Sequence, residues 1–381
     1  MQEDTPKPLS PPEAAPPEAP LPQEPVRNIK DFTLEGLTDW MKARGQPAFR
    51  ARQVFQWLYQ KHVRNFDEMT NISKDFRELL RRHFHLGLLE VAAVKESADG
   101  SRKFAFALED GKLIEAVLMP NNTHFTVCIS SQVGCAMGCG FCSTARMGLQ
   151  RNLTTGEIVQ QAVELARQAH LDGDDRIIRN IVFMGMGEPL HNYDNLVSAL
   201  HILQDDHGFG LSSRRITVST SGLVPGINRL ARDDVRIMLA VSLNGVTDEM
   251  RSRLMPVNRR WKIAELLQAC RNIPSPNRTR ITFEYVMLEG ETDGLENARK
   301  LVRLLHGLKC KVNLIPYNPH PGSPYRPSTP EHCREFQRVL LEKGLLATLR
   351  ISKGQDIQAA CGQLITGIPA ARGAKRQATT A

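Results

Sequence analysis

The segment Cys128-Ile-Ser-Ser-Gln-Val-Gly-Cys135-Ala-Met-Gly-Cys139-Gly-Phe-Cys142 decides how the rest of the chain is interpreted, because it holds four of the eight cysteines. Its last three cysteines follow a C-x3-C-x2-C pattern. Thiolates bind iron and other soft metals, and the glycines between them let the backbone wrap so that three sulfurs converge. A zinc site would need a fourth ligand nearby, whereas an iron-sulfur cluster with three protein ligands leaves one iron open. The alternative is an accidental group of ordinary cysteines.

Downstream of this segment, short apolar runs alternate with helical patterns. The runs, each expected to be a β-strand, are 125–129, 180–183, 216–218, 237–243, 281–287 and 312–315. The helical patterns between them are 155–170, 195–203, 225–232, 263–271 and 295–308. Such an alternation predicts a parallel sheet with helices outside it. Because six strand-helix units fall short of the eight in a closed barrel, the predicted fold is α/β, a partial (β/α)6 barrel.

Polar or glycine-rich segments follow five of these strands. They are the cysteine segment itself, then GMGEP at 185–189, STSG at 219–222, SLNG at 242–245 and PYNP at 316–319. Because sites in such sheets gather at the carboxyl ends of the strands, we expect these segments to face one cavity. Glycine at 187 permits close approach to the backbone, and the carboxylate of Glu188 suits an ammonium group. Each segment alone is equally consistent with a turn or a helix cap.

The remainder of the chain is expected to form smaller parts around the barrel. The predicted order is a disordered Pro-rich extension at 1–25, a helical accessory domain at 26–95, a β-hairpin linker at 96–124, the barrel at 125–320, a C-terminal segment with a cysteine loop at 321–367, and a basic flexible tail at 368–381. The basic residues of the helical domain indicate either a solvated face or an RNA-contacting surface. In the hairpin, Glu115 stands among apolar residues, where a carboxylate is costly unless it is paired or used.

Charge and hydropathy narrow the class of protein. The net charge of +8 favours a polyanionic partner, although many enzymes carry as much. No apolar run approaches the roughly 20 residues that span a bilayer, and the amino terminus lacks a signal-peptide core, so we expect a cytoplasmic protein. Thiolate ligands also need a reducing compartment, which favours metal-binding, reactive or core cysteines over disulfides.

The C-x3-C-x2-C pattern resembles the signature of the radical S-adenosylmethionine (SAM) enzymes. In that superfamily the open iron chelates SAM, and an electron from the cluster cleaves SAM to a 5′-deoxyadenosyl radical. Further motifs narrow the resemblance: Cys128 seven residues before the cluster, GMGEP, STSG, NLIPYNP at 313–319 and AACGQL at 359–364. Together they resemble the dual-specificity RNA methyltransferase family RlmN over residues 28 to 367.

This resemblance implies methylation of carbon 2 of adenosine in 23S rRNA, at the peptidyl transferase centre, and in tRNA, next to the anticodon. Carbon 2 is electrophilic and cannot attack the methyl group of SAM, so a radical route is required. Cys361 would receive a methyl group from one SAM, and a radical made from a second SAM would take a hydrogen from that S-methyl group. The resulting methylene radical would add to the base and leave the RNA bound to the enzyme. Cys128 would release it, and Glu115 would accept the proton from the adenine carbon.

The resemblance also implies the cofactor ligands and partners. One 4Fe-4S cluster would be held by Cys135, Cys139 and Cys142. Two SAM molecules per turnover would be bound by Gly187, Glu188, Ser219, Ser242, Leu243, Asn244 and Asn318. Because the family commonly has histidine where this chain has Asn244, only a backbone contact is expected there. The expected partners are 23S rRNA, tRNA and an electron donor such as flavodoxin, and the enzyme is expected to be a monomer.

Three alternatives remain open. A close relative, the Cfr type, shares all these cysteines, methylates carbon 8 of the same rRNA adenosine and confers antibiotic resistance. A non-catalytic RNA-binding protein with a structural cluster would leave Cys128 and Cys361 unexplained. A radical SAM enzyme that acts on a peptide or a small molecule would not need the basic N-terminal domain.

Overall fold

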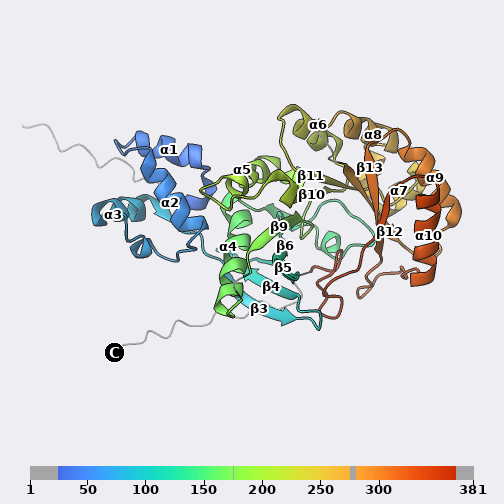
Figure 1. Ribbon diagram of the computed structural model, residues 1–381, viewed down its shortest axis with the longest axis horizontal. Coiled ribbons are helices and arrows are strands. Elements are labelled where there is room, and N and C mark those ends of the chain that lie inside the picture. The colour runs from blue at the N-terminus through green and yellow to red at the C-terminus, as the bar shows by residue number, and fades with distance from the viewer. Residues whose placement is uncertain (1–24, 175, 275–279, 366–381) are drawn as a thin grey trace, which may run out of the picture.

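The computed structural model describes residues 25–365 except for residues 175 and 275–279. The predicted extension at 1–25 lies outside the described residues except for residue 25, and the predicted tail at 368–381 lies wholly outside them. The described residues form one ten-stranded sheet, two two-stranded sheets and ten α-helices (Figure 1). The smaller sheets pair β1 (Arg27–Asn28) with β2 (Phe84–His85) and β7 (Gln132–Gly134) with β8 (Leu149–Asn152).

Six parallel strands form the centre of the large sheet, and they follow one another in chain order. They are β6 (Phe125–Cys128), β9 (Ile178–Phe183), β10 (Ile216–Thr220), β11 (Met238–Ser242), β12 (Ile281–Met287) and β13 (Cys310–Pro316). Each neighbouring pair is parallel, from β6 beside β9 to β12 beside β13. The predicted strands and the predicted α/β partial barrel are therefore confirmed. A short strand, β14 (Ala347–Leu349), extends the sheet beyond β13 and was not predicted.

Helices connect the parallel strands and cover the sheet. Those at the predicted positions are α4 (Thr155–Leu171), α5 (Tyr193–Gln204), α6 (Val224–Arg232), α8 (Ile263–Arg271) and α9 (Leu295–Leu305). The start of α4 shows why: Thr154 and Glu157 each bond the backbone N–H of the other, which forms a capping box. Two further helices, α7 (Asp248–Leu254) and α10 (Pro330–Glu342), were not predicted.

An antiparallel extension continues the sheet beyond β6. The predicted hairpin is confirmed as β4 (Arg102–Ala107) and β5 (Leu113–Pro120), and β5 pairs with β6 so that Val117 lies opposite Cys128. A third strand, β3 (Glu90–Glu96), forms the edge of the sheet. Most of its residues are exposed, which explains why its sequence lacks a strong apolar signal.

The N-terminal helices stand at one end of the molecule (Figure 1). They are α1 (Leu34–Lys42), α2 (Phe49–Tyr59) and α3 (Lys74–His83). The short helix that precedes them contacts α4, where the Asp31 carboxylate accepts a hydrogen bond from the Gly156 N–H at 2.7 Å. Beside it, the buried Lys30 ammonium donates to the Leu86 carbonyl at 2.7 Å. The hydrogen bond between Asp31 and Gly156 fixes the helical part against the barrel.

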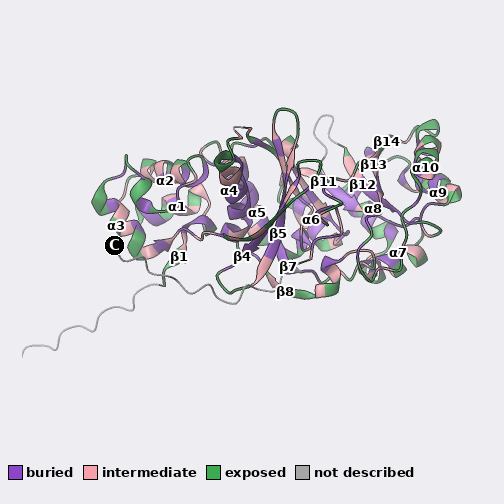
Figure 2. Ribbon diagram, turned by 90° about the horizontal axis from the view of Figure 1, so that it is seen from below, coloured by how far each residue is buried: buried purple, intermediate pink, exposed green. Residues whose placement is uncertain are grey.

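Buried residues follow the sheet and the inner faces of its helices (Figure 2). A smaller apolar cluster lies apart from this core and packs against Met137, Cys139 and Phe141 of the cysteine loop. The cluster consists of Leu254, Met255, Val257, Val286, Leu288, Ile315 and Tyr317. Through its contacts with Met137, Cys139 and Phe141, the small cluster supports the loop that carries the three cysteines.

Among the described residues, no helix is long and apolar enough to cross a membrane.

Candidate active site

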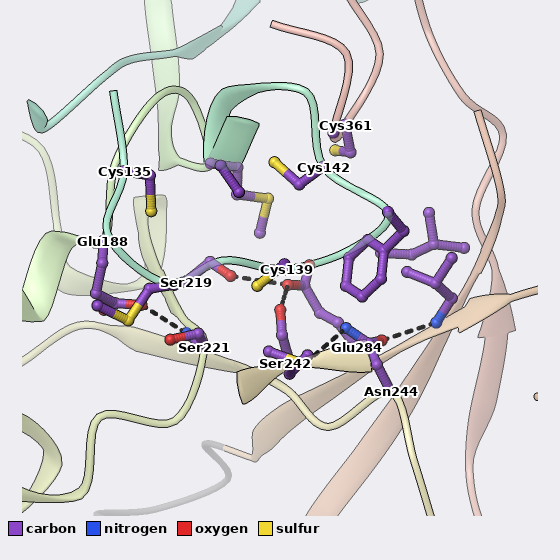
Figure 3. A pocket seen from close by; sticks show the side chains of 18 of the residues that line it. Cys135, Cys139, Cys142, Glu188, Ser219, Ser221, Ser242, Asn244, Glu284 and Cys361 are labelled. Carbon is purple, nitrogen blue, oxygen red and sulfur yellow. Dashed lines mark hydrogen bonds between the residues drawn. The ribbon is translucent and has the colours of Figure 1, made fainter. Parts of the chain in front are cut away.

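A cavity lies at the carboxyl ends of the parallel strands, and all three cysteines of the C-x3-C-x2-C pattern line it together with Cys361. Figure 3 shows the cysteine loop arching over the cavity, with the polar residues from the strand ends on the opposite side. The predicted residues that also line it are Gly187, Glu188, Ser219, Ser242, Asn244 and Asn318. The expected convergence of the strand-end segments on one cavity is thus what the structure shows.

Backbone contacts hold the cysteine loop in place. The Cys135 N–H donates to the Gly148 carbonyl at 3.0 Å, and the Gly140 N–H donates to the Leu254 carbonyl at 2.9 Å. Gly134 has a φ of 74°, and a Cβ there would lie 1.8 Å from the Gly148 oxygen. Only glycine can therefore occupy this position without moving the strand beside it.

The three cysteines are the candidate ligands for a metal cluster, because thiolates are the ligands that iron-sulfur clusters use. Within the described parts of the chain, no three Cys, His, Asp or Glu side chains are grouped so that they could hold one metal ion. The three cysteines line one cavity. Burial raises the pKa of Cys135 to about 12 and raises the pKa of Cys139 and Cys142 as well. Burial thus favours the thiol over the thiolate, and binding of a metal here would have to release these protons.

Glu188 is the acidic group on one side of the cavity. Its carboxylate accepts hydrogen bonds from the Ser221 N–H at 2.7 Å and the Leu190 N–H at 3.1 Å. Burial raises its pKa, and these hydrogen bonds oppose that rise. Next to it, Gly187 has a φ of 103°, and a Cβ would lie 2.6 Å from the Cβ of Gln132. Gly187 therefore lines the cavity with no room for a side chain on its Gln132 side, and a carboxylate stands beside it.

A second carboxylate, Glu284 on β12, was not identified from the sequence. It accepts hydrogen bonds from the hydroxyls of Ser219 at 2.8 Å and Ser242 at 3.1 Å, so it joins three neighbouring strands at the cavity wall (Figure 3). Its signal in the sequence is a single acidic residue inside the apolar strand ITFEYVM. This is the same kind of signal that drew attention to Glu115.

At the end of β11, Ser242 and Asn244 line the cavity, whereas Leu243 is part of the hydrophobic core. Asn244 lines the cavity, but its side-chain oxygen accepts a hydrogen bond from the Val286 N–H at 2.9 Å. Its φ is 49°, a left-handed conformation that asparagine tolerates better than most residues. The side chain of Leu243 is fully buried in the hydrophobic core and does not line the cavity. Of the predicted residues in this part of the chain, Ser242 and Asn244 line the cavity, whereas the side chain of Leu243 points into the core.

Asn318 connects the barrel to the Cys361 loop. Its side-chain amide donates to the Cys361 carbonyl at 3.2 Å, and its oxygen accepts from Gln355 at 2.6 Å. On the other side, the Ser143 N–H donates to the Gly362 carbonyl at 2.7 Å. These bonds attach the C-terminal loop directly to the segment that follows Cys142.

Cys128 and Glu115 lie on neighbouring strands and do not line the cavity. Burial raises the pKa of Cys128 to about 12, with a further contribution from Cys361, while Arg350 opposes the rise. The two cysteines are thus close enough to interact electrostatically. Glu115 is buried, pairs with Lys103 at 3.1 Å and accepts a hydrogen bond from the Ile365 N–H at 3.0 Å.

Arg350 is a further residue near the two thiols that the sequence did not single out. Its guanidinium donates to the sulfur of Met184 at 3.5 Å, and Met184 lines the cavity. The pKa of Arg350 is raised chiefly by Cys361, with contributions from Glu284 and Cys128. A cation therefore stands among the two cysteines and the cavity carboxylate.

Known proteins share this arrangement. Residues 129–302 match the family described as Radical SAM superfamily, and residues 27–86 match the Ribosomal RNA large subunit methyltransferase N-terminal domain. The fold, the cysteine loop and these matches define a radical SAM enzyme. Membership of this superfamily implies a 4Fe-4S cluster and SAM.

Closer relatives identify the family. The chain is 50% identical over 345 residues to the dual-specificity RNA methyltransferase RlmN of Pelobacter propionicus, which covers 91% of this chain and 97% of that protein. It is also 50% identical over 337 residues to the RlmN of Geotalea uraniireducens, with 88% and 96% covered. The crystal structure of a radical SAM methyltransferase from Sphaerobacter thermophilus has a TM-score of 0.83 and 46% identity, and covers 89% of this chain and 99% of that one. The chain belongs to the dual-specificity RNA methyltransferase RlmN family, as its motifs predicted.

Proposed function

We propose that this protein methylates carbon 2 of adenosine in 23S rRNA, at the peptidyl transferase centre, and in tRNA, next to the anticodon. The observation that carries the proposal is that Cys361 lines the same cavity as Cys135, Cys139 and Cys142. The residue that would accept the methyl group is thus next to the residues that would hold the cluster. The names of the relatives, which are dual-specificity RNA methyltransferases, support RNA as the substrate.

The cavity residues would hold the cluster and SAM. Cys135, Cys139 and Cys142 would ligate a 4Fe-4S cluster with one open iron. When bound, such a cluster would supply the electron that converts SAM into a hydrogen-abstracting radical, and it would accept the one electron released once the new carbon–carbon bond has formed. The Glu188 carboxylate would accept a hydrogen bond from the SAM ammonium group, next to Gly187 in the cavity wall.

The other cavity residues would bind the nucleoside part of SAM. Carboxylates are well suited to accept hydrogen bonds from ribose hydroxyls. Glu284, with Ser219 and Ser242 already bonded to it, provides such a group at the cavity wall. Asn244 would offer its backbone, because its side chain is engaged by Val286. Asn318 would contact SAM while it holds the Cys361 loop.

Cys361 would carry the methyl group in two stages. Its thiolate first attacks the methyl carbon of one SAM, so that a carbon–sulfur bond forms on Cys361 and S-adenosylhomocysteine leaves. A hydrogen atom is then removed from the S-methyl group, and the methylene radical on Cys361 adds to carbon 2 of adenine. Carbon 2 loses one electron and its proton, which Glu115 accepts. The RNA is then covalently attached to Cys361.

Cys128 would release the RNA. Its thiolate attacks the sulfur of Cys361, so that a disulfide forms between the two cysteines and the bond from Cys361 to the methylene carbon breaks. The carbon keeps the electron pair and takes up a proton to become the methyl group of the product. A dithiol reductant would restore the two thiols before the next turnover. The electrostatic coupling of Cys128 and Cys361 supports this pairing.

The N-terminal helices would contact the RNA backbone. Arg52, Lys61 and Lys74 are exposed on this part of the molecule, where they are available to phosphate groups. The match to the N-terminal domain of a ribosomal RNA methyltransferase supports this role. A Debye length of about 10 Å at 0.1 M salt means that such contacts weaken as salt rises.

The test uses protein reconstituted anaerobically with iron and sulfide and supplied with SAM, reduced flavodoxin as electron donor and RNA. We expect a 4Fe-4S absorbance that is lost on replacing any of the three cluster cysteines, and 2-methyladenosine after RNA digestion. A methyl group on carbon 8 would instead indicate the Cfr type of reaction. RNA methylation that survives Cys361→Ala would refute the relay.

A further inference from the structure

Two oppositely charged side chains are buried together beside the Cys361 loop. The Lys103 ammonium on β4 lies 3.1 Å from a Glu115 carboxylate oxygen on β5, and their side chains are only 6% and 2% exposed. The register places Ala105 opposite Glu115, so Lys103 is two residues along on the neighbouring strand. Burial of a charge is costly without a partner, which means that each of these groups depends on the other.

Both members of the pair also bind the loop that carries Cys361. The Lys103 ammonium donates to the Gln358 carbonyl at 3.0 Å, three residues before Cys361. The Glu115 carboxylate accepts from the Ile365 N–H at 3.0 Å, four residues after Cys361. The ion pair therefore touches both sides of the loop, and Gln358 is held there with a left-handed φ of 56°.

We propose that Lys103 is a positioning residue for the proton-transfer step: it keeps Glu115 an ionised carboxylate and fixes it relative to both arms of the Cys361 loop. The inference rests on the proposed function, in which Glu115 accepts the proton from carbon 2. An acceptor must be unprotonated when the methylene radical has added to the base. Lys103 meets that need without contacting the RNA base itself.

The charges around Glu115 support this role. Burial is the largest influence and raises the pKa of Glu115, while Lys103 is the largest opposing one, through both its charge and its hydrogen bond. The Ile365 N–H and the more distant Lys95 on β3 oppose the rise less strongly. Removal of the Lys103 charge therefore raises the pKa of Glu115 further, and a smaller fraction of the enzyme is ready to accept a proton at low pH.

The experiment compares Lys103→Met, which removes the charge at similar length, with Lys103→Arg, which keeps it. Lys95→Met, which removes the weaker and exposed charge, is the matched control. Each reconstituted enzyme is first methylated at Cys361, which mass spectrometry verifies. RNA is then added for a single turnover, and the rate of adduct formation is followed from about pH 6 to about pH 9.

We expect the acid limb of the Lys103→Met profile to move to higher pH by about one unit, so that its rate falls a few-fold below the wild-type rate near pH 6 and recovers as pH rises. Lys103→Arg and Lys95→Met should keep the wild-type limb. A deficit of the same size at every pH would show that Lys103 only holds the loop, and would overturn the inference.

A measurement on the wild-type protein does not depend on how well the variants fold. Carboxyl-carbon NMR of protein labelled at glutamate, with the Glu115 signal assigned from Glu115→Gln, should show Glu115 ionised near pH 7. A protonated Glu115 at that pH would refute the inference. If Cys361 of the wild-type enzyme never gains a methyl group, the proposed function fails and this inference with it, whereas a methylated Cys361 without the pH shift refutes the inference alone.

Discussion

The Arg251→Met substitution tests how the cavity wall is held together. Arg251 is fully buried, and its guanidinium binds the segments that follow β10 and β11. It donates four hydrogen bonds, to the carbonyls of Leu243 at 3.0 Å, Ser221 at 2.5 Å and Ser242 at 3.3 Å and to the side-chain oxygen of Asn258 at 3.0 Å. Methionine fills a similar volume but leaves all four acceptors without their donor.

The expected loss of stability follows from these bonds. An acceptor that loses a charged donor costs about 2 kcal/mol, or about 8 kcal/mol for four. Against this, burial lowers the pKa of Arg251 to about 10 from 12.5, and the roughly 3 kcal/mol that this desolvation represents is regained in the variant. The net destabilisation is about 5 kcal/mol, which lowers the unfolding midpoint by roughly 5 to 10 °C in a chain of this size.

Thermal unfolding of the protein without cluster, followed by circular dichroism at one fixed scan rate, measures this shift. Arg253→Met is the matched control, because Arg253 lies on the same helix, is exposed and pairs with Glu291 at the surface. Its midpoint should change by less than about 1 °C. An Arg251→Met midpoint equal to that of the control would refute the reasoning.

Three further predictions concern the site. Because burial raises the pKa of Cys128 to about 12, release of the RNA adduct should accelerate about tenfold per pH unit between about pH 7 and pH 9. The decay of the cross-linked band on a denaturing gel measures this rate, and a pH-independent decay would contradict the prediction. Glu284→Gln should weaken SAM binding about tenfold in equilibrium dialysis, whereas the exposed Glu289→Gln should not, and equal affinities for the two variants would exclude Glu284 as a SAM ligand. Gly187→Ala should also reduce SAM affinity at least about tenfold, because the alanine Cβ would lie 2.6 Å from Gln132 and a φ of 103° is strained for alanine. An unchanged dissociation constant would show that the backbone at this position does not contact SAM.

The parts of the fold that the sequence predicted are those with a strong local signal. Apolar runs such as 281–287 form largely buried strands because their β-branched and aromatic residues pack well on a pleated sheet. The edge strands were not predicted, because β3 is mostly exposed and β14 has only three residues. The helix α7 is likewise only seven residues long, and four of its residues are charged.

The site was predictable where function is concentrated in neighbouring residues. The spacing of Cys135, Cys139 and Cys142 is visible in the sequence, and the structure places all three around one cavity. Lys103 and Arg350 gain their importance from contacts with residues more than ten positions away, which no local pattern records. In the sequence alone, a lysine or an arginine at these positions is indistinguishable from an ordinary surface residue.

The most direct test of the central claim follows the hydrogens of the transferred methyl group. Enzyme reconstituted with its cluster is supplied with SAM that carries three deuterium atoms on its methyl group, and the methylated adenosine is weighed by mass spectrometry after RNA digestion. If the methyl passes through Cys361 and loses one hydrogen to the radical, the product methyl carries two deuterium atoms and one hydrogen from solvent, and 5′-deoxyadenosine gains the third deuterium. A product that retains all three deuterium atoms would contradict the account.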